Sequence, residues 1–226
     1  MTNMTNQTNQ TNQSQNLTQD QTQSNPSPTS IKALKQLTTD QLIARMRIGV
    51  ESIDPRIFEL SNEQLDQAWT PDANIGLWPI RVVLGHLADV EMVFATRIRK
   101  IYAEESPTLA IFDEHAFVDS AIYGCTQGST MSPPIGGDVA TIHTLRSWLI
   151  AFLYQLDASD WERTGLHPDH GPVSIHTLAV YNCWHLERHA WFINAKTERF
   201  LGPRPVPEAC SDSGCSKPGC QCGPQE

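Results

Sequence analysis

No run of apolar residues in this sequence reaches the ~20 that a membrane-spanning helix needs. Basic residues are also few, because 16 lysines and arginines stand against 25 aspartates and glutamates, for a formal net charge of −9. No basic stripe is present, so we expect no nucleic-acid partner and no membrane partner. Phosphate-binding motifs such as G-x-G-x-x-G and the P-loop are missing. The N-terminus lacks the basic start and apolar core of a signal peptide, so we expect a cytoplasmic protein.

The two ends of the chain have little that could fill a core. Residues 1–30 are mainly Thr, Asn, Gln and Ser, with no lysine or arginine. Such a segment cannot bury enough surface to offset its chain entropy. Residues 205–226 are rich in Pro, Gly and Cys. We therefore expect two disordered tails around a single domain, residues 31–204, which is long enough for a sizeable core.

Helical periodicity dominates the middle of the chain. Four long segments with few glycines and prolines repeat apolar residues along one face; they cover about 40–53, 79–102, 138–156 and 174–196. Thr38 with Gln41 fits a capping box before the first segment, and Asp138 and Ser174 are candidate N-caps of the last two. A short helical turn is expected over 61–67. No convincing strand pair is visible, so the sequence predicts an all-α four-helix bundle.

The connections indicate how the four helices run. Residues 103–137, between the second and third helices, are too many for a simple hairpin between neighbours. We expect a crossover there, so that the second and third helices run in the same direction. The second and fourth helices would then be antiparallel.

Three histidines lie on the inward faces of the second and fourth helices. His185 and His189 are four residues apart in the stretch "YNCWHLERHAWFI", which places them on one helix face with Leu178. His86 lies among the apolar residues of "WPIRVVLGHLADVE", on the stripe that contains Val82 and Val90. Counted at 1.5 Å per residue, His86 from the start of its helix and His189 from the end of its own lie at similar heights. In an antiparallel pair the three side chains can therefore meet.

Two interpretations of this meeting are open. The histidines could simply pack in the core, as most isolated apolar-face histidines do. Three buried imidazoles, however, satisfy their nitrogens poorly without a proton or a cation, and an i, i+4 pair presents two nitrogens to one ion. We favour a divalent metal on His86, His185 and His189. Histidine ligands suit Zn²⁺, Ni²⁺, Fe²⁺ or Cu²⁺ and do not choose among them.

The two stretches that carry these histidines resemble the DinB-like (DinB/YfiT-like) superfamily. They are residues 78–91 and 167–189, and the resemblance extends over about 35–200. It implies a four-helix bundle in up-down-down-up order, often a homodimer, with a divalent metal on the three histidines. Known members include S-transferases and isomerases that use small cytosolic thiols. The resemblance therefore implies a divalent metal, Zn, Ni or Fe, and a low-molecular-weight thiol as co-substrate.

Other polar residues have weaker claims on the site. Asp89 lies one turn from His86, where it could hold the second nitrogen of a ligand histidine or pair with a surface arginine. Asp113, Glu114 and His115 lie in the crossover and could reach the mouth of the site. His167, His170 and His176 are expected at the start of the fourth helix in turn or capping roles.

Four cysteines lie in the C-terminal tail, and they are Cys210, Cys215, Cys220 and Cys222. Persistent disulfides are not expected in a reducing cytoplasm. Four thiols so close together could bind a soft metal, but no C-x-x-C pair supports a zinc ribbon. A second metal site and a disordered or redox-active tail are therefore equal alternatives.

Two functions fit these observations. In the first, the protein is an enzyme whose metal activates a small thiol, for S-transfer to a small-molecule substrate, or water, for hydrolysis. In the second, it is a non-catalytic metal carrier or sensor that uses the bundle and the cysteine tail. An open coordination position beside a reachable cavity would favour the enzyme.

Overall fold

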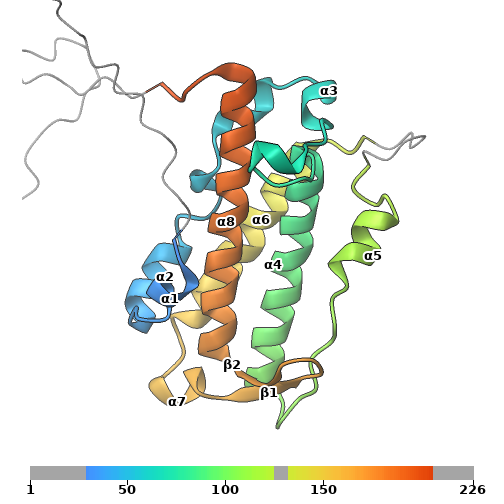
Figure 1. Ribbon diagram of the computed structural model, residues 1–226. Coiled ribbons are helices and arrows are strands. Elements are labelled where there is room, and N and C mark those ends of the chain that lie inside the picture. The colour runs from blue at the N-terminus through green and yellow to red at the C-terminus, as the bar shows by residue number, and fades with distance from the viewer. Residues whose placement is uncertain (1–28, 125–131, 206–226) are drawn as a thin grey trace, which may run out of the picture.

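Four helices pack side by side in a computed structural model that describes residues 29–124 and 132–205 (Figure 1). They are α2 (Thr39–Met46), α4 (Ile80–Ala103), α6 (Ile135–Leu153) and α8 (Ile175–Leu201). In Figure 1, α4 and α6 run in one direction while α2 and α8 run in the other. The up-down-down-up bundle and the antiparallel pairing of α4 with α8 are confirmed. Among the described residues, no helix combines the length and apolar character required to cross a membrane.

Shorter elements connect the bundle helices. They are α1 (Ile31–Leu34), η1 (Gly49–Ser52), η2 (Pro55–Glu59), α3 (Asn62–Leu65), η3 (Pro71–Ala73), α5 (Glu114–Asp119), α7 (Ala158–Trp161), β1 (Thr164–His167) and β2 (Gly171–Ser174). Both tails predicted from the sequence fall almost wholly outside the described residues, and the domain limits stay a prediction.

The first bundle helix is shorter than predicted. Its start is as expected, since Gln41 N donates to Thr38 Oγ1 at 3.2 Å and Thr38 N donates to Gln41 Oε1 at 3.0 Å. The α-helix nevertheless ends at Met46 and not at residue 53. Gly49 has φ +50°, a left-handed conformation that interrupts an α-helix. A 3₁₀ turn at Gly49–Ser52 follows.

The other helix limits move by a few residues. α6 begins at Ile135 after Pro134, so Asp138 lies in its first turn and is not the predicted N-cap. Ser174 does cap α8, because Thr177 N donates to its Oγ at 3.1 Å. α8 continues past the predicted end at Lys196 to Leu201. These shifts leave the histidine faces unchanged.

A two-stranded hairpin precedes α8, so the expectation of no strand pair was wrong. β1 and β2 pair antiparallel with Thr164 opposite Ser174 and His167 opposite Gly171. The crossover adds a second short pairing, in which Leu109 N donates to Leu166 O at 2.9 Å. Strands of four residues with few β-branched side chains leave a weak sequence pattern, and here tertiary pairing with the crossover supports them.

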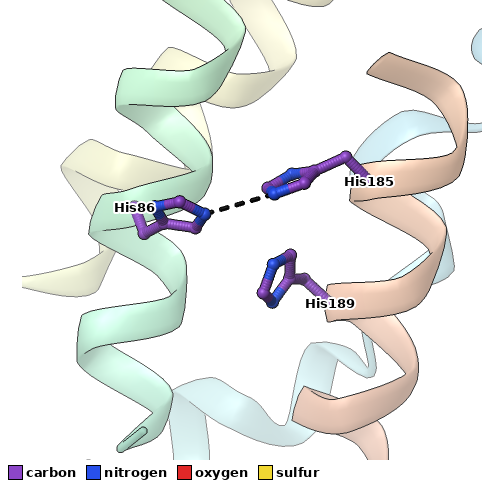
Figure 2. Close-up of side chains that lie close together, drawn as sticks. All are labelled: His86, His185 and His189. Carbon is purple, nitrogen blue, oxygen red and sulfur yellow. Dashed lines mark hydrogen bonds between the residues drawn. The ribbon is translucent and has the colours of Figure 1, made fainter. Parts of the chain in front are cut away.

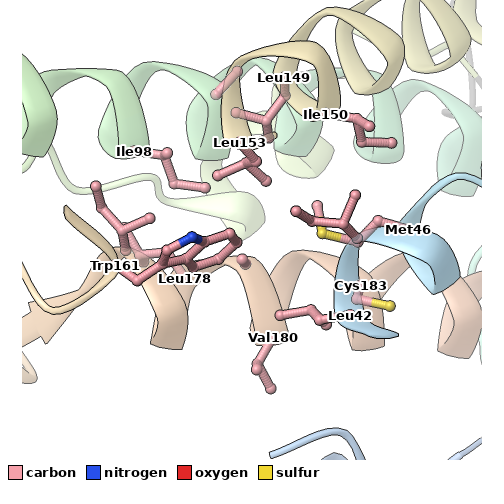
Figure 3. Packing of buried hydrophobic residues seen from close by; sticks show 14 of the residues in the cluster. Leu42, Met46, Ile98, Leu149, Ile150, Leu153, Trp161, Leu178, Val180 and Cys183 are labelled. Atoms are coloured by element: carbon pink, nitrogen blue, oxygen red, sulfur yellow. The ribbon is translucent and has the colours of Figure 1, made fainter. Parts of the chain in front are cut away.

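Two apolar clusters fill the bundle, and one of them is drawn in Figure 3. That cluster joins α2, the second half of α4, α6 and the first half of α8 around Met46, Ile98 and Leu178 (Figure 3). The other joins the first half of α4, the start of α6 and the middle of α8 around Leu84 and Leu186. This division places the histidines of α4 and α8 beside the second cluster.

A buried polar group lies between the two clusters. Arg146 of α6 and Glu91 of α4 are 3 % and 1 % exposed. Arg146 Nε donates to Glu91 Oε1 at 3.1 Å, and its Nη2 donates to the same oxygen and to the carbonyl of Asn182 at 3.2 Å. The guanidinium thus connects α4, α6 and α8 one to two turns from the histidines. These contacts hold together the two helices that carry the histidines, α4 and α8.

Candidate metal centre

Three imidazoles meet between α4 and α8, as predicted. Figure 2 shows His86 projecting from α4 toward His185 and His189 of α8. Nε2 of His86 lies 3.3 Å from Nε2 of His185. One ligand nitrogen from each ring can be chosen so that all three lie within 4.8 Å of one another. No other such group of His, Cys, Asp or Glu side chains occurs in the described ranges.

The spacing suits a shared metal ion. Two imidazole nitrogens bound to one tetrahedral Zn²⁺ at about 2.1 Å lie about 3.4 Å apart. The observed 3.3 Å between His86 and His185 agrees with this. A hydrogen bond between the two rings could explain that contact alone, but it would leave His189 without a role. A metal ion uses all three rings, so the residues present fit the ion.

Burial keeps these histidines neutral at ordinary pH. Burial lowers the pKa of His86 from 6.5 to about 4 and that of His189 to about 3. The pKa of His185 falls well below 6.5, first through burial and then through the neighbouring His189 and His86. A neutral imidazole offers a nitrogen lone pair, which is the form a metal binds. The site is thus prepared for a cation without any prior loss of protons.

The Nδ1 atoms of the three rings lack hydrogen-bond partners among the described residues. In His86, His185 and His189 alike, this nitrogen is buried. Metal-binding histidines usually donate this N–H to a carboxylate or a carbonyl. Asp89, the residue considered for that role, instead accepts a hydrogen bond from Tyr123 Oη at 2.6 Å. Its carboxylate is engaged by the crossover and not by an imidazole.

Aromatic rings surround the triad on two sides. Trp78, which precedes α4, lies parallel to His189 with ring centroids 6.3 Å apart and edge-on to His86 at 5.1 Å. Phe112 of the crossover stacks on His86 at 6.1 Å. Rings at these positions limit the access of water and fix the orientation of the imidazoles. His185 and His189 are partly buried, whereas His86 is fully buried.

A cavity of about 300 Å³ opens beside His189. Its lining is largely apolar, with Trp78 and Phe192 on its walls. Two cationic residues, Arg188 and Lys196, also border it, and none of its described lining residues is acidic. Burial lowers the pKa of Lys196 from 10.5 to about 8, and its Nζ donates to the Trp78 carbonyl at 2.7 Å. The cavity thus offers apolar contact and positive charge next to the imidazoles.

A carboxylate also approaches the triad from the crossover. Glu114, the first residue of α5, places Oε2 at 3.8 Å from Nε2 of His86. Its side chain is 46 % exposed, so it stands where the site meets solvent. His115 and Asp113 are exposed, and Asp113 caps α5 by accepting from Ala116 N at 3.0 Å. Of the three crossover residues considered from the sequence, the structure brings Glu114 to the site.

Other histidines and cysteines of the chain lie away from the triad or outside the described residues. His167 belongs to the hairpin, where its Nδ1 accepts from Asp169 N at 3.2 Å and its ring stacks on that of His170 at 4.6 Å. Cys183 is a core residue, 1 % exposed, and burial raises the pKa of its thiol to about 12. The four tail cysteines, Cys210, Cys215, Cys220 and Cys222, lie outside the described residues, as does Cys125.

Sequence reasoning missed the lining of the cavity. Trp78 and Lys196 are far apart in the chain and come together because α4 and α8 are antiparallel. The available signal for Lys196 was its spacing, since it follows His189 by seven residues and therefore lies on the same helix face. Trp78 immediately before Pro79 gave the same kind of hint, since a large aromatic ring next to a helix start often packs on the neighbouring helix.

Known proteins are similar to this chain in sequence. Residues 28–193 match the DinB superfamily. A protein of Oceanobacillus iheyensis named "Putative metal-dependent hydrolase OB0782" is 30% identical over 144 residues, 63% of this chain and 76% of its own length. A Bacillus licheniformis protein with the same description is 31% identical over 143 residues, 62% of this chain and 74% of its own.

The fold is found in a solved structure as well. YfiT from Bacillus subtilis, described as a probable metal-dependent hydrolase with an unusual four-helix bundle topology, aligns with a TM-score of 0.61. The alignment covers 74% of this chain and 89% of YfiT at 22% sequence identity, which supports the shared fold. With the family match across most of the bundle, the chain belongs to the DinB superfamily.

Proposed function

We propose that this protein is a metal-dependent hydrolase that acts on small molecules. The observation that carries the proposal is the meeting of three neutral imidazoles from α4 and α8 beside a reachable cavity. His86, His185 and His189 would hold a divalent ion such as Zn, Ni or Fe. When bound, that ion supplies Lewis-acid activation of water or of a thiol. The names of the relatives support this choice of reaction class.

The cavity indicates what the substrate should look like. Trp78 and Phe192 give it flat apolar walls, and such walls bind the apolar body of a small molecule. The guanidinium carbon of Arg188 lies 5.1 Å from the centre of the Phe192 ring, near the same walls. An arginine without an acidic neighbour in the lining favours a carboxylate or another anionic group on the substrate. We infer a small amphiphilic anion as the substrate class.

Two alternatives use the same residues. Thiol S-transfer rests on the family resemblance, and it would need a thiol in the position taken here by water. A metal carrier or sensor would need the site to be closed, whereas His185 and His189 are partly exposed. Homodimer formation and a cytoplasmic location stay predictions.

A substrate panel tests the proposal. Protein loaded separately with Zn²⁺, Ni²⁺ and Fe²⁺ is incubated with chromogenic esters and amides that carry a carboxylate, and with their neutral analogues. We expect hydrolysis that His185→Ala abolishes and that favours the anionic substrates. Hydrolysis equal in the wild-type and His185→Ala proteins would refute the proposal. Conjugation of small thiols to a chromogenic electrophile, lost in His185→Ala, would replace hydrolysis by S-transfer.

A further inference from the structure

The crossover carries a carboxylate to the triad, and this placement is specific. Glu114 Oε2 lies 3.8 Å from Nε2 of His86, on the side of the ring that faces His185. The grouping of ligand atoms within 4.8 Å contains the three imidazoles and leaves Glu114 out. The carboxylate therefore stands next to the coordination group and not within it. That position suits contact with a molecule that approaches the ion from solvent.

Contacts on both sides of Glu114 hold it there. Before it in the chain, Phe112 stacks on the His86 ring at 6.1 Å and also packs against Phe117 of α5 at 4.8 Å. After it, Tyr123 donates to Asp89 of α4 at 2.6 Å. The segment that carries the carboxylate lies beside α4 (Figure 1), and these side-chain contacts join it to that helix.

The residue beside His86 makes this fastening possible. Gly85 has no side chain, and a Cβ at that position would lie 2.4 Å from a ring carbon of Tyr123. Real Cβ atoms do not approach so closely, so any other residue would displace the tyrosine. Tyr123 is 6 % exposed in this contact. The close packing of the crossover on α4 therefore depends on the sequence next to the histidine ligand.

We propose that Glu114 is the general base of the site, a role that rests on the proposed function. Its Oε2 accepts the proton from the attacking water as the water oxygen forms a bond to the electrophilic carbon of the substrate. The O–H bond of water breaks, and the proton on Glu114 then passes to the leaving group as the substrate bond breaks. Glu114 thereby returns to the carboxylate. Tyr123 acts as a positioning residue, because it reaches the reaction only through the crossover.

Anion binding to the Co²⁺-loaded protein tests the placement without any turnover. A negative charge beside the open position repels an anionic ligand, so we expect azide, followed by the visible spectrum of Co²⁺, to bind several-fold tighter to Glu114→Gln than to wild type. Metal content should be the same in both. Asp119→Asn removes one charge from the exposed far end of the same helix and should leave azide affinity unchanged.

Activity supplies the second measurement. Glu114→Gln should lower kcat by about 10²-fold or more, Glu114→Asp should recover part of it, and Tyr123→Phe should cost less with metal content intact. Equal azide affinity in wild type and Glu114→Gln would overturn the proposal, even where hydrolysis is seen. A loss of metal from Glu114→Gln would also overturn it, because the carboxylate would then be a ligand. Wild-type protein that binds no Co²⁺ would refute the proposed function itself.

Discussion

Nε2 of His86 faces Nε2 of His185 across 3.3 Å, although the two residues belong to different helices and are 99 positions apart in the chain. The contact exists because α4 and α8 run antiparallel and bring the same height of each helix together. His189 joins from the next turn of α8. Each histidine alone is a weak indication of a metal site. The topology of the bundle brings the three together into one site.

Acid should destabilise the metal-free protein. Burial holds the pKa of His86 at about 4 and that of His189 at about 3, against 6.5 for an ordinary histidine. Below pH 6.5 these histidines bind protons in the unfolded chain while they stay neutral in the folded chain. Their contribution to the free energy of unfolding is therefore complete above pH 6.5 and is lost as pH falls through the folded pKa values. Urea unfolding between pH 7.5 and 5 measures this loss, which approaches about 1.4 kcal/mol per histidine for each pH unit below 6.5.

His143 provides the matched control for this prediction, since it is exposed on α6. We expect His143→Gln to leave the pH dependence as it is, and His189→Gln to make it shallower. A free energy of unfolding that stays constant from pH 7 to 5 in the metal-free protein would contradict the burial of neutral histidines.

Removal of Arg146 should weaken the bundle strongly. Arg146→Met leaves the Glu91 carboxylate, 1 % exposed, buried without its partner. Breaking a buried ion pair in this way costs about 3–5 kcal/mol. Chemical unfolding of the metal-free proteins should show this loss, with part of it recovered in the double variant Arg146→Met, Glu91→Leu.

A surface pair gives the comparison. Lys100 and Glu104 form an i, i+4 ion pair with side chains that are 36 % and 50 % exposed. Lys100→Met should change the free energy of unfolding by less than about 1 kcal/mol. If Arg146→Met costs no more than Lys100→Met, the buried ion pair does not hold the three helices together as described.

Truncation after Arg204 should leave the metal centre intact. Just after α8, the carbonyls of Gly202 and Pro203 accept hydrogen bonds from Arg56 Nη1 at 3.2 and 3.3 Å, and both residues remain in the shortened chain. We expect the same midpoint of thermal unfolding and the same histidine-bound metal as in the full chain. Any additional metal on the full chain would belong to the tail cysteines. Loss of all metal on truncation would show that the tail completes the main site.

The bundle and the triad could be predicted because both follow from local periodicity. Spacings of three, four and seven residues put His86, His185 and His189 on inward faces, and the length of the crossover set the helix directions. Helix ends were harder, since Gly49 interrupts the first helix through its backbone conformation and not through a break in the apolar pattern.

The crossover residues could not be predicted in the same way. Nothing in the sequence near Glu114 specifies its distance from His86. That distance follows from Phe112 on the His86 ring and from Tyr123 against Gly85 and Asp89, which are contacts between segments far apart in the chain. The β1–β2 hairpin was not predicted for a related reason, because its pairing with Leu109 is also a contact between segments far apart in the chain.

The metal content of two purified proteins tests the central claim most directly. Elemental analysis should find about one divalent metal ion per chain in the wild type. His86→Ala should hold almost none, because two imidazoles on α8 alone bind a divalent ion far more weakly than three. Circular dichroism should show the same helix content in both proteins. A His86→Ala protein that keeps full metal occupancy would contradict the three-histidine site.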